Sequence, residues 1–463
     1  MARAVLGLLS LALAGGGFIA VQRGAGHGPV QAPQAAAAAL AAPPPAATRD
    51  DRLLEALRSD LQLQRQLILL FADEGRLEGR ARAQALEAGH RLHHDRRELV
   101  HQVSAALRTL AARPAAQRDP EVQALLDWME GDPELLDLDR LAFRDSLRTL
   151  QHALEPDPSP AGLALRLRLN RDLGTLDRLE REVDEEYRQV FGGPGQAAPG
   201  SSRTRWDAYV AALRSRVSVA GLLPRGEEPA PPPSPTPGAA PTPAQRELTG
   251  TEFPEKVLVL TFDDGPHPLY TGELKALLLR EHVPAVFFEV GRNLGVLDGS
   301  GQARLSHGAA LTEDLVQAGF VVGNHSYTHA QLSKETGAPL DLEIRETDQL
   351  LRAIPGAHSQ LFRFPYGARS APQLQALVPY HLRSVLWNID SLDWADPVPS
   401  SVADRVLKAI AQEKRGILLF HDIHDRAGKV LPVLIPRLRA EGYTFAGLDP
   451  DGALVLPQSL AKP

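Results

Sequence analysis

The sequence predicts a parallel α/β sheet or barrel in its C-terminal part, preceded by a separate α-helical domain. Three observations lead to this fold class. From residue 255 onward, strand-like and helix-like segments alternate, and strands that are joined by crossover helices run parallel. Several of the strand-like segments are apolar almost throughout, as expected for strands buried on both faces. Upstream of a proline-rich stretch, the spacing of apolar residues is instead that of helices.

The N-terminus predicts an export signal. Arg3 precedes an apolar run, and Ala12-Leu13-Ala14 offers a cleavage pattern of small residues. If it is not cut, the run to Val21 has a marginal length for a membrane span. We expect residues 1–22 to be a signal peptide or an N-terminal anchor, so that the protein is exported to the periplasm or cell envelope or is secreted. Contact with a membrane is expected only if the segment stays uncleaved. The alternative to an export signal is that this apolar segment forms a buried N-terminal helix.

Three further segments precede the α/β part. Residues 23–48 are rich in Ala, Pro and Gly and lack apolar periodicity, which predicts a flexible spacer. Residues 49–222 place leucines at three- and four-residue steps among charges, which predicts a helical bundle or coiled-coil-like domain of roughly four to six helices. Residues 223–250 contain PAPPPSPTPGAAPTP, which favours extended polyproline II and predicts a linker.

Residues 251–456 are expected to form the α/β domain. Its predicted strands are 256–262, 284–290, 319–324, 361–365, 382–389, 416–421 and 443–448. Helices are predicted between them at 271–281, 311–318, 340–353, 401–414 and 429–441. This alternation implies a parallel sheet or barrel.

Polar clusters follow five of these predicted strands. They are Asp263-Asp264-Gly265-Pro266, His325-Ser326-Tyr327-Thr328-His329, Arg363 with Tyr366, Asp390-Ser391-Leu392-Asp393-Trp394, and His421-Asp422-Ile423-His424. Because the carboxyl ends of parallel strands form one rim, where catalytic groups converge, we expect the clusters to meet in space. Each cluster alone could be a turn, a surface ion pair or a core residue. Five of them at the ends of successive strands favour one shared site.

An Asp and two His on this rim predict a bound metal ion. The neighbouring carboxylates Asp263 and Asp264 can take different roles, one as a metal ligand and the other as a base. If His325 and His329 lie on one helical turn, both imidazoles point at one centre. Two His and one Asp, with water completing the shell, form a plausible catalytic zinc arrangement.

A second pair of histidines has the same spacing as His325 and His329. His90 and His94 lie in the predicted helical domain, among charged residues and with no carboxylate cluster assigned to them. Because this spacing is common by chance, we interpret the pair as a solvated helix face.

The composition excludes several classes of site and partner. The chain has no Cys, which excludes thiolate metal ligands, disulfides and cysteine nucleophiles. A metal must therefore be held by His and carboxylate groups. The formal net charge of −7 argues against binding to nucleic acid.

Residues 255–450 resemble the polysaccharide deacetylases of the NodB-homology group, carbohydrate esterase family 4. The segments that carry the resemblance are Thr261-Phe-Asp-Asp-Gly-Pro266, His325-Ser-Tyr-Thr-His329, Arg363-Phe-Pro-Tyr366, Asp390-Ser-Leu-Asp-Trp394 and Leu419-Phe-His421. Their order and spacing also match the family. The resemblance implies a deformed (β/α) barrel with about seven parallel strands, fewer than the eight of a regular (β/α) barrel.

The resemblance also implies roles for the residues of the rim. Asp264, His325 and His329 would be the metal ligands, and Asp263 the general base. Arg363 would orient the base, and a backbone N–H of Tyr366 would face the oxyanion. His421 would be the general acid, tuned by Asp393. Trp394 would form a wall of the pocket, and Tyr366, Trp394 and Leu419 would contact the substrate.

The activity implied is the metal-dependent removal of N-acetyl groups from a polysaccharide that contains N-acetylglucosamine, such as peptidoglycan, poly-N-acetylglucosamine or a chitin-like chain. The divalent metal is expected to be Zn²⁺, with Co²⁺ or Ni²⁺ as alternatives. Two other functions stay open, an O-acetyl esterase acting on xylan-like polysaccharide and a glycan-binding module without catalysis. The helical domain is expected to act as a spacer or to contact a protein partner.

Two features depart from the family pattern. The stretch between Asn293 and Leu311 is long and contains DGSGQARLSHG, and Glu289 places a charge in an otherwise apolar strand. Both are expected near the substrate groove, where they would affect the choice of substrate rather than the chemistry.

Overall fold

The structure, a computed structural model, describes residues 49–72, 79–191, 204–218 and 247–457. The predicted signal or anchor (1–22), the spacer (23–48) and most of the predicted linker (223–250) lie outside these residues. Within the described ranges, no helix combines the length and the apolar character that a bilayer span requires.

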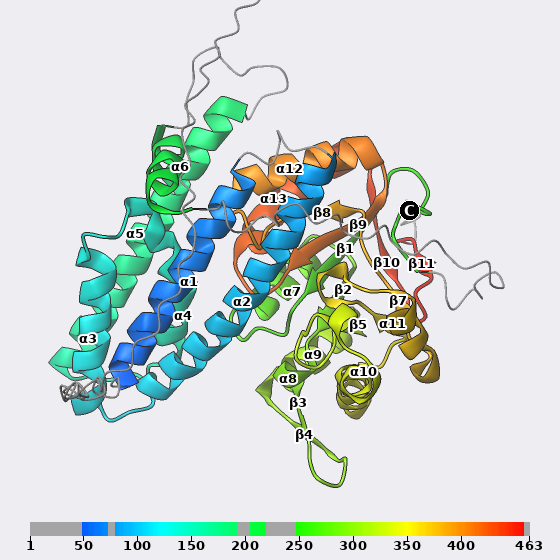
Figure 1. Cartoon of the computed structure of the whole chain (residues 1–463), viewed down its shortest axis with the longest axis horizontal. Coiled ribbons are helices and arrows are strands. Elements are labelled where there is room, and N and C mark those ends of the chain that lie inside the picture. Colours follow the sequence, from blue (N-terminus) through cyan, green and yellow to red (C-terminus); the bar gives the residue numbers. More distant parts are fainter. Residues whose placement is uncertain (1–48, 73–78, 192–203, 219–246, 458–463) are drawn as a thin grey trace, which may run out of the picture. The chain divides into compact units, whose positions relative to one another are not determined.

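The described part before residue 219 is helical, as predicted. Its helices are α1 (Arg49–Phe71), α2 (Gly79–Ala111), α3 (Ala115–Gly131), the 3₁₀ helix η2 (Asp137–Phe143), α4 (Arg144–Ala153), α5 (Pro160–Phe191) and α6 (Thr204–Arg216). Figure 1 shows α1 and α2 lying along each other, and a buried ion pair of 2.9 Å joins Asp60 Oδ1 to Arg96 Nε between them. Leu57, Leu107 and Phe143 are almost fully buried in the core of these helices.

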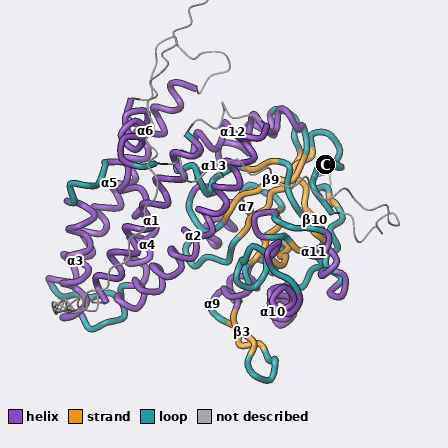
Figure 2. The backbone as a smooth tube through the Cα atoms, in the orientation of Figure 1, coloured by secondary structure: helices purple, strands orange, loops and turns teal. Residues whose placement is uncertain are grey.

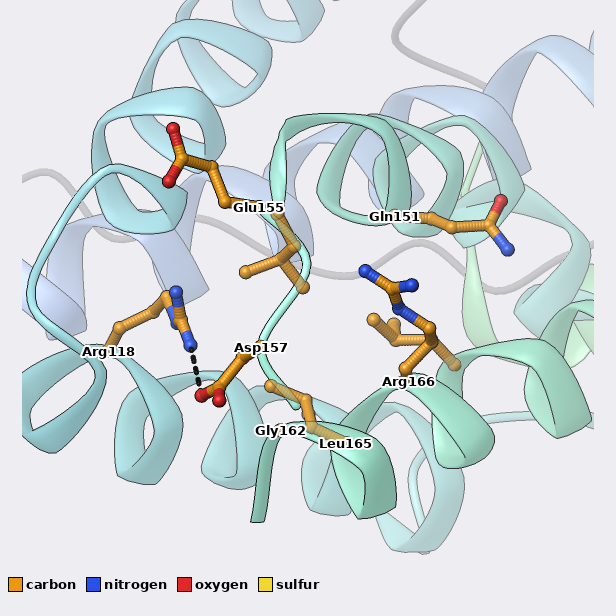
Figure 3. Close-up of a pocket in the computed structure, with 9 residues that line it drawn as sticks. Arg118, Gln151, Glu155, Asp157, Gly162, Leu165 and Arg166 are labelled. Carbon is orange, nitrogen blue, oxygen red and sulfur yellow. Dashed lines mark ion pairs between the residues drawn. The ribbon is translucent and has the colours of Figure 1, made fainter. Parts of the chain in front are cut away.

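A small pocket lies within this helical part, between α3, α5 and the loop that joins α4 to α5. Figure 3 shows Arg118 and Asp157 next to each other on one side of it, joined by an ion pair. The distance between Arg118 Nη2 and Asp157 Oδ2 is 3.8 Å. The pocket has a volume of about 20 Å³, which is room for about one water molecule. It has no residue in common with the predicted rim.

The strands of the α/β part form one curved sheet. They are β1 (Val257–Asp263), β2 (Ala285–Glu289), β5 (Val321–Asn324), β6 (Leu361–Phe362), β7 (Arg383–Ser384), β8 (Ile389–Asp390), β9 (Gly416–His421), β10 (Thr444–Leu448) and β11 (Leu454–Val455). Parallel pairing gives the order β8-β9-β1-β2-β5-β6-β7, with β10 also parallel to the first half of β1 and β11 antiparallel to β10. The predicted deformed (β/α) barrel of about seven parallel strands, preceded by a helical part, is thus confirmed.

The predicted strand 382–389 is divided in two. β7 pairs with β6, and β8 pairs with β9, so that one segment of the chain supplies both ends of the parallel array. Between them, the side chain of Asn388 takes over the backbone pairing: its Oδ1 accepts from Ile417 N at 3.0 Å, and its Nδ2 donates to Arg415 O at 3.1 Å. A side chain that competes for backbone groups in this way ends a strand.

Helices cover the outside of the sheet, as Figure 2 shows. They are α7 (Tyr270–Arg280), α8 (Gly291–Leu294), α9 (His307–Gln317), α10 (Gly337–Ala353), α11 (Ala371–Ala376), α12 (Pro399–Glu413) and α13 (Arg426–Ala440), with the 3₁₀ helices η4 (Leu332–Lys334), η5 (Pro365–Gly367) and η6 (Val378–Tyr380). Helices α7, α9, α10, α12 and α13 each return the chain to the start of the next parallel strand of the sheet, as crossover connections require.

The alternation of side chains along β1 decides what faces the barrel interior. Leu258, Leu260 and Phe262 belong to the core beneath the helices, whereas Val257 and Val259 belong to a second core inside the sheet. Successive residues of a strand point to opposite faces. Thr261 and Asp263 therefore continue the interior row, and β1 delivers Asp263 to the rim of the barrel.

The same alternation shows that Glu289 does not face a substrate groove. Ala285 and Phe287 of β2 belong to the helix-side core, and Glu289 lies on that face two residues later. Its side chain is fully buried, and Thr312 of α9 donates a hydrogen bond to its Oε2. The expectation that Glu289 lies near the substrate groove was therefore wrong.

The long stretch after Asn293 forms a β-hairpin. Its strands are β3 (Gly295–Leu297) and β4 (Ala303–Leu305), and they pair antiparallel. Figure 1 shows the hairpin projecting beyond α8 and α9.

Candidate active site

Asp263 and Asp264 end β1 and diverge. Asp264 has φ = 84°, a left-handed conformation that is uncommon for a residue other than glycine. Its N–H donates to Phe288 O at 3.1 Å, which fixes the turn beside β2. The two adjacent carboxylates consequently meet different partners, as expected if one is a base and the other a metal ligand.

Asp263 is held by Arg363. Arg363 Nη1 donates to Asp263 Oδ1 at 2.7 Å, and the arginine side chain is fully buried. Its other donors reach Thr261 Oγ1 at 2.7 Å and the carbonyl oxygens of Val385 and Leu386, both at 3.0 Å. Burial lowers the pKa of Arg363 from its ordinary value, and the charge of Asp263 opposes this. The predicted pair is present, and Thr261 joins it without having been predicted.

His325 and His329 lie in the loop after β5. The two residues do not lie on a helical turn, because Ser326 and His329 both have φ = 66° and the segment is not helical. A carboxylate of α10 holds the loop instead: Glu343 Oε2 accepts from Tyr327 N and Thr328 N at 3.0 and 2.8 Å. The two imidazole rings still converge, with their centroids 4.9 Å apart.

Asp264 Oδ1 lies between these rings. It is 3.4 Å from His325 Nε2 and 3.1 Å from His329 Nε2, and one ligand atom of each residue lies within 4.8 Å of the others. The other nitrogen of His325, Nδ1, is 2.8 Å from Arg363 O, which turns Nε2 toward Asp264. Metal-bound histidines are commonly oriented by such a carbonyl.

The three residues fit a divalent cation. Among the described residues, neither oxygen of Asp264 has a hydrogen bond of ordinary geometry, although both are buried. Burial alone would raise the pKa of Asp264, but the nearby charge of Arg97 holds it well below its ordinary value. Burial lowers the pKa of His329 well below its ordinary value, so this imidazole is neutral. An ionised carboxylate and a neutral imidazole are the forms that bind a metal.

His421 pairs with Asp393. His421 ends β9 directly beside Asp263 of β1, and its Nδ1 is 2.7 Å from Asp393 Oδ1. The other oxygen of Asp393 accepts from His421 N at 2.9 Å. Burial by itself would lower the pKa of His421, but the charge and hydrogen bond of Asp393 raise it to about 9. The imidazole is therefore protonated at neutral pH, as a general acid must be.

The predicted pocket residues surround a small cavity beside these groups. It has a volume of about 20 Å³ and is lined by His90, His93, Asp263, His325, His329, Tyr366, Trp387, Trp394, Leu419 and His421. Leu419 lies two residues before His421 on the same face of β9. The ring of Tyr366, a residue of η5 with φ = 60°, stands edge-on to His329 with centroids 4.6 Å apart.

Helix α2 reaches this site, and the interpretation of His90 and His94 as a solvated helix face was wrong. His90 packs its ring against Trp394 and Tyr366, with centroid distances of 5.5 and 5.9 Å. Although His94 is exposed, its Nδ1 lies 2.7 Å from Tyr366 Oη. The frequency of this spacing by chance carried no information on what the helix packs against.

Two further residues of α2 lie at the metal-ligand position and were missed. Arg97 Nε is 3.2 Å from Asp264 Oδ2, and His93 Nε2 is 3.9 Å from the same oxygen. The signal available was weak: His90, His93 and Arg97 share one helical face, which many solvated helices also show. Trp387 of the barrel was also missed, since it carries no charge to mark it.

The chain was compared with known proteins. The sequence profile described as Polysaccharide deacetylase matches residues 250–385. A chitooligosaccharide deacetylase of Rhizobium leguminosarum bv. trifolii is 30% identical over 209 residues, which are 42% of this chain and 91% of that protein. The peptidoglycan-N-acetylglucosamine deacetylase PgdA of Listeria monocytogenes is 29% identical over 194 residues, 42% of this chain and 38% of that protein.

A solved structure covers the same part of the chain. The family 4 carbohydrate esterase from Streptomyces lividans in complex with acetate is 28% identical, with a TM-score of 0.38, and the match covers 44% of this chain and 98% of that one. The profile match and the near-complete coverage of the rhizobial protein show that this chain belongs to the polysaccharide deacetylase family, carbohydrate esterase family 4, through the NodB homology domain in its C-terminal half.

Proposed function

We propose that the protein is a metal-dependent deacetylase that removes N-acetyl groups from a polysaccharide containing N-acetylglucosamine. The observation that supports this most is the meeting of three functional units on one rim. They are the ligand set around Asp264, the Arg363–Asp263 pair and the His421–Asp393 pair. Amide hydrolysis requires an electrophile, a base and an acid, and each unit supplies one of them.

The first half of the reaction uses Asp263. A divalent cation bound by Asp264, His325 and His329 would polarise the acetyl carbonyl and make a water molecule more acidic. Asp263 takes the proton of the attacking water, and Arg363 keeps the carboxylate in position through the 2.7 Å hydrogen bond. The backbone N–H of Tyr366 is proposed to donate to the developing oxyanion, a contact that is typically worth about 3–4 kcal/mol.

The second half uses His421. Its imidazolium donates a proton from Nε2 to the departing amine while Nδ1 stays bound to Asp393. General acid catalysis of this kind typically contributes about 10²- to 10⁴-fold. Trp394 and Leu419, which line the cavity, are proposed to contact the sugar that carries the acetyl group.

The relatives support a glycan substrate with N-acetyl groups. One is named for chitooligosaccharides and another for the N-acetylglucosamine of peptidoglycan. With the predicted export signal at 1–22, they favour a polymer of the cell envelope or the medium as the substrate. We propose Zn²⁺ as the metal, because two imidazoles and one carboxylate form a common catalytic zinc shell.

The test is acetate release by the purified full-length chain. Peptidoglycan, N-acetylglucosamine oligomers and O-acetylated xylan oligomers are compared after chelation and after addition of Zn²⁺, Co²⁺ or Ni²⁺. We expect release from an N-acetylated substrate that chelation stops and metal restores. Release from xylan alone would make the protein an O-acetyl esterase. Glycan binding without any release would make it a binding module.

A further inference from the structure

The catalytic rim is covered in the folded chain. Asp264, His325, His329 and His421 are 1%, 2%, 4% and 6% exposed, and Trp394 is 2% exposed. The cavity between them, about 20 Å³, holds about one water molecule. A sugar unit of a polysaccharide cannot enter a space of this size. Something must therefore move before a polymer reaches the ligand set.

The covering element is the pair of helices α1 and α2. The rings of His90 and His93 pack against Trp394 at a tilt of 47°, with centroid distances of 5.5 and 5.1 Å, and Phe71 at the end of α1 makes an edge contact with it at 5.3 Å. Side chains of α1 and α2 thus surround Trp394, the residue that is proposed above to contact the sugar.

The residue of α2 that lies beside the metal-ligand position is the cation Arg97. Arg97 Nε lies 3.2 Å from Asp264 Oδ2, so the guanidinium neutralises the carboxylate that the ligand set needs. A cation bound by Asp264 Oδ1 and the two histidines would lie close to Arg97 and repel it. Metal loading and the docked position of α2 therefore oppose each other.

The contacts of α2 with the barrel are apolar near Trp394 and polar farther out. Ala88 and Leu92 of α2 belong to one apolar cluster with Trp394. Glu98 Oε2 pairs with Arg292 Nη1 at 2.8 Å, and His94 bonds to Tyr366 Oη at 2.7 Å. An ion pair as exposed as Glu98–Arg292 contributes little to the docked state. A second apolar cluster joins Tyr187 of α5 and Trp206 of α6 to Val398, the residue before α12, and it also includes Ile68 and Leu69 of α1 but no residue of α2. The helical part can thus stay attached while α2 leaves the rim.

We propose that α2 is an intramolecular plug of the substrate groove: it occupies the place of the sugar chain and leaves the rim before a polysaccharide binds. The proposal leaves the covalent chemistry of the site unchanged. It makes the access of the polysaccharide to the catalytic rim depend on the position of α2. The occupant of the groove is a segment of the same chain, so the inhibition does not depend on protein concentration. The proposal rests on the proposed function only for the identity of the ligand that the plug excludes.

The test locks the plug reversibly. Because the chain has no Cys, the double variant Glu98→Cys/Arg292→Cys carries two unique thiols at the outer contact. A thiol-reactive cross-linker with a disulfide in its spacer joins them, and reduction releases them. The two single-cysteine variants, treated in the same way, control for the modification itself.

The first readout requires neither metal nor glycan. Diethyl pyrocarbonate modifies accessible imidazoles, and peptide mass spectrometry follows its reaction with His325 and His329 in the metal-free chain. We expect the reaction to be at least tenfold slower in the locked chain than after reduction. Equal rates in the two states would overturn the plug, because the rim would be accessible with α2 held in place.

The second readout is binding of an N-acetylglucosamine oligomer to the zinc-loaded double variant, measured by calorimetry in an Asp263→Asn background that prevents turnover. Binding should be lost on locking and return on reduction. If the oligomer binds in neither state while the imidazoles still become accessible on reduction, the plug stands and the proposed substrate is wrong. If the locked chain binds the oligomer as tightly as the released chain, the plug is wrong.

A milder variant tests the same equilibrium without a cross-linker. Glu98→Gln removes the ion pair to Arg292 and should strengthen oligomer binding by up to about fivefold, the factor by which an exposed pair shifts a two-state balance. Glu87→Gln is the matched control, since Glu87 pairs at 2.9 Å with Arg91 one turn along the same helix. It should leave binding unchanged, and an equal effect of both variants would contradict the proposal.

Discussion

Arg363 Nη1 donates a hydrogen bond of 2.7 Å to Asp263 Oδ1, and 3% or less of either residue is exposed. An ion pair at this depth is costly unless the remaining donors of the arginine are satisfied. Here Thr261 and two carbonyl groups accept them, and the guanidinium lies over the ring of Phe288 at 4.1 Å. The pair is therefore a rigid support for the carboxylate, built from β1, β6 and the segment that follows β7.

Replacement of Arg363 should damage both stability and activity. Arg363→Met keeps much of the side-chain volume but leaves Asp263 buried without its cation, which typically costs about 3–5 kcal/mol. We expect a loss of that size in the free energy of unfolding of the barrel, measured with urea, and no measurable acetate release. Asp263→Asn is the comparison: its amide oxygen still accepts from Arg363, so activity should vanish with a smaller loss of stability. Full activity of Arg363→Met would refute the supporting role of the arginine.

The barrel and its rim could be predicted because they depend on local patterns. Apolar strands locate the sheet, and a polar cluster at each carboxyl end locates a functional group, whatever the details of the loops. The division of the fifth predicted strand could not be foreseen, since it depends on Asn388 reaching the backbone of β9. Likewise, the loop at His325 takes its shape from Glu343 of α10, which accepts hydrogen bonds from the loop backbone. No sequence pattern links this glutamate to the loop.

The packing of α2 on the catalytic rim could not be predicted from the sequence, for a different reason. Helical periodicity shows that α2 has an apolar face, but not which surface that face meets. The face of α2 that contacts the site carries His90, His93 and Arg97, which is also the composition of many solvated faces. Only the three-dimensional arrangement places Arg97 beside Asp264 and Phe71 beside Trp394.

The alkaline limit of activity should report His421. Its pKa is raised from its ordinary value to about 9, so the imidazolium that donates the proton persists from acid pH and is lost as the pH rises through about 9. We expect kcat/KM for acetate release to fall along a limb near that value. In Asp393→Asn the charge that favours the imidazolium is gone, and the limb should move to lower pH. A limb at the same pH in both proteins would show that another group is responsible.

Metal content should depend on the cluster at Asp264 and not on a neighbouring one. Among the described residues, Asp393, His421 and His424 also place one ligand atom each within 4.8 Å of the others. Asp393 is already engaged by His421 through two hydrogen bonds, whereas the Asp264 oxygens have none of ordinary geometry. His329→Ala should therefore abolish binding of zinc, measured as metal per chain after dialysis, and His424→Ala should retain it. The reverse result would move the metal to the second cluster.

Arg97 should compete with the metal for Asp264. A neighbouring cation stabilises a carboxylate by the equivalent of about 1–3 pKa units, and the same attraction opposes a second cation. Arg97→Gln should therefore bind zinc roughly tenfold more tightly in calorimetry. Arg96→Gln is the matched control, because the adjacent arginine pairs with Asp60 within the helical part at 2.9 Å. Zinc affinity that is equal in both variants and the unaltered chain would mean that Arg97 does not restrict the ligand set.

Glu289 should make the stability of the barrel fall as the pH rises. Burial raises the pKa of Glu289 well above its ordinary value, and the charge of Asp422 adds to this, while the hydrogen bond from Thr312 opposes it. The carboxyl group is thus neutral when folded but ionised in the unfolded chain above its ordinary pKa of about 4.3, so folding takes up a proton. Each pH unit above that value then reduces the free energy of unfolding by up to about 1.4 kcal/mol.

Glu289→Gln removes this dependence, because the amide oxygen can still accept from Thr312 and no proton is exchanged. Relative to the unaltered chain, the variant should gain stability progressively between about pH 5 and 8, measured by urea unfolding followed through tryptophan fluorescence. Glu273→Gln, at an exposed position of α7, controls for the loss of one carboxylate. A constant difference between Glu289→Gln and the unaltered chain at all pH values would show that Glu289 carries the same charge in both states.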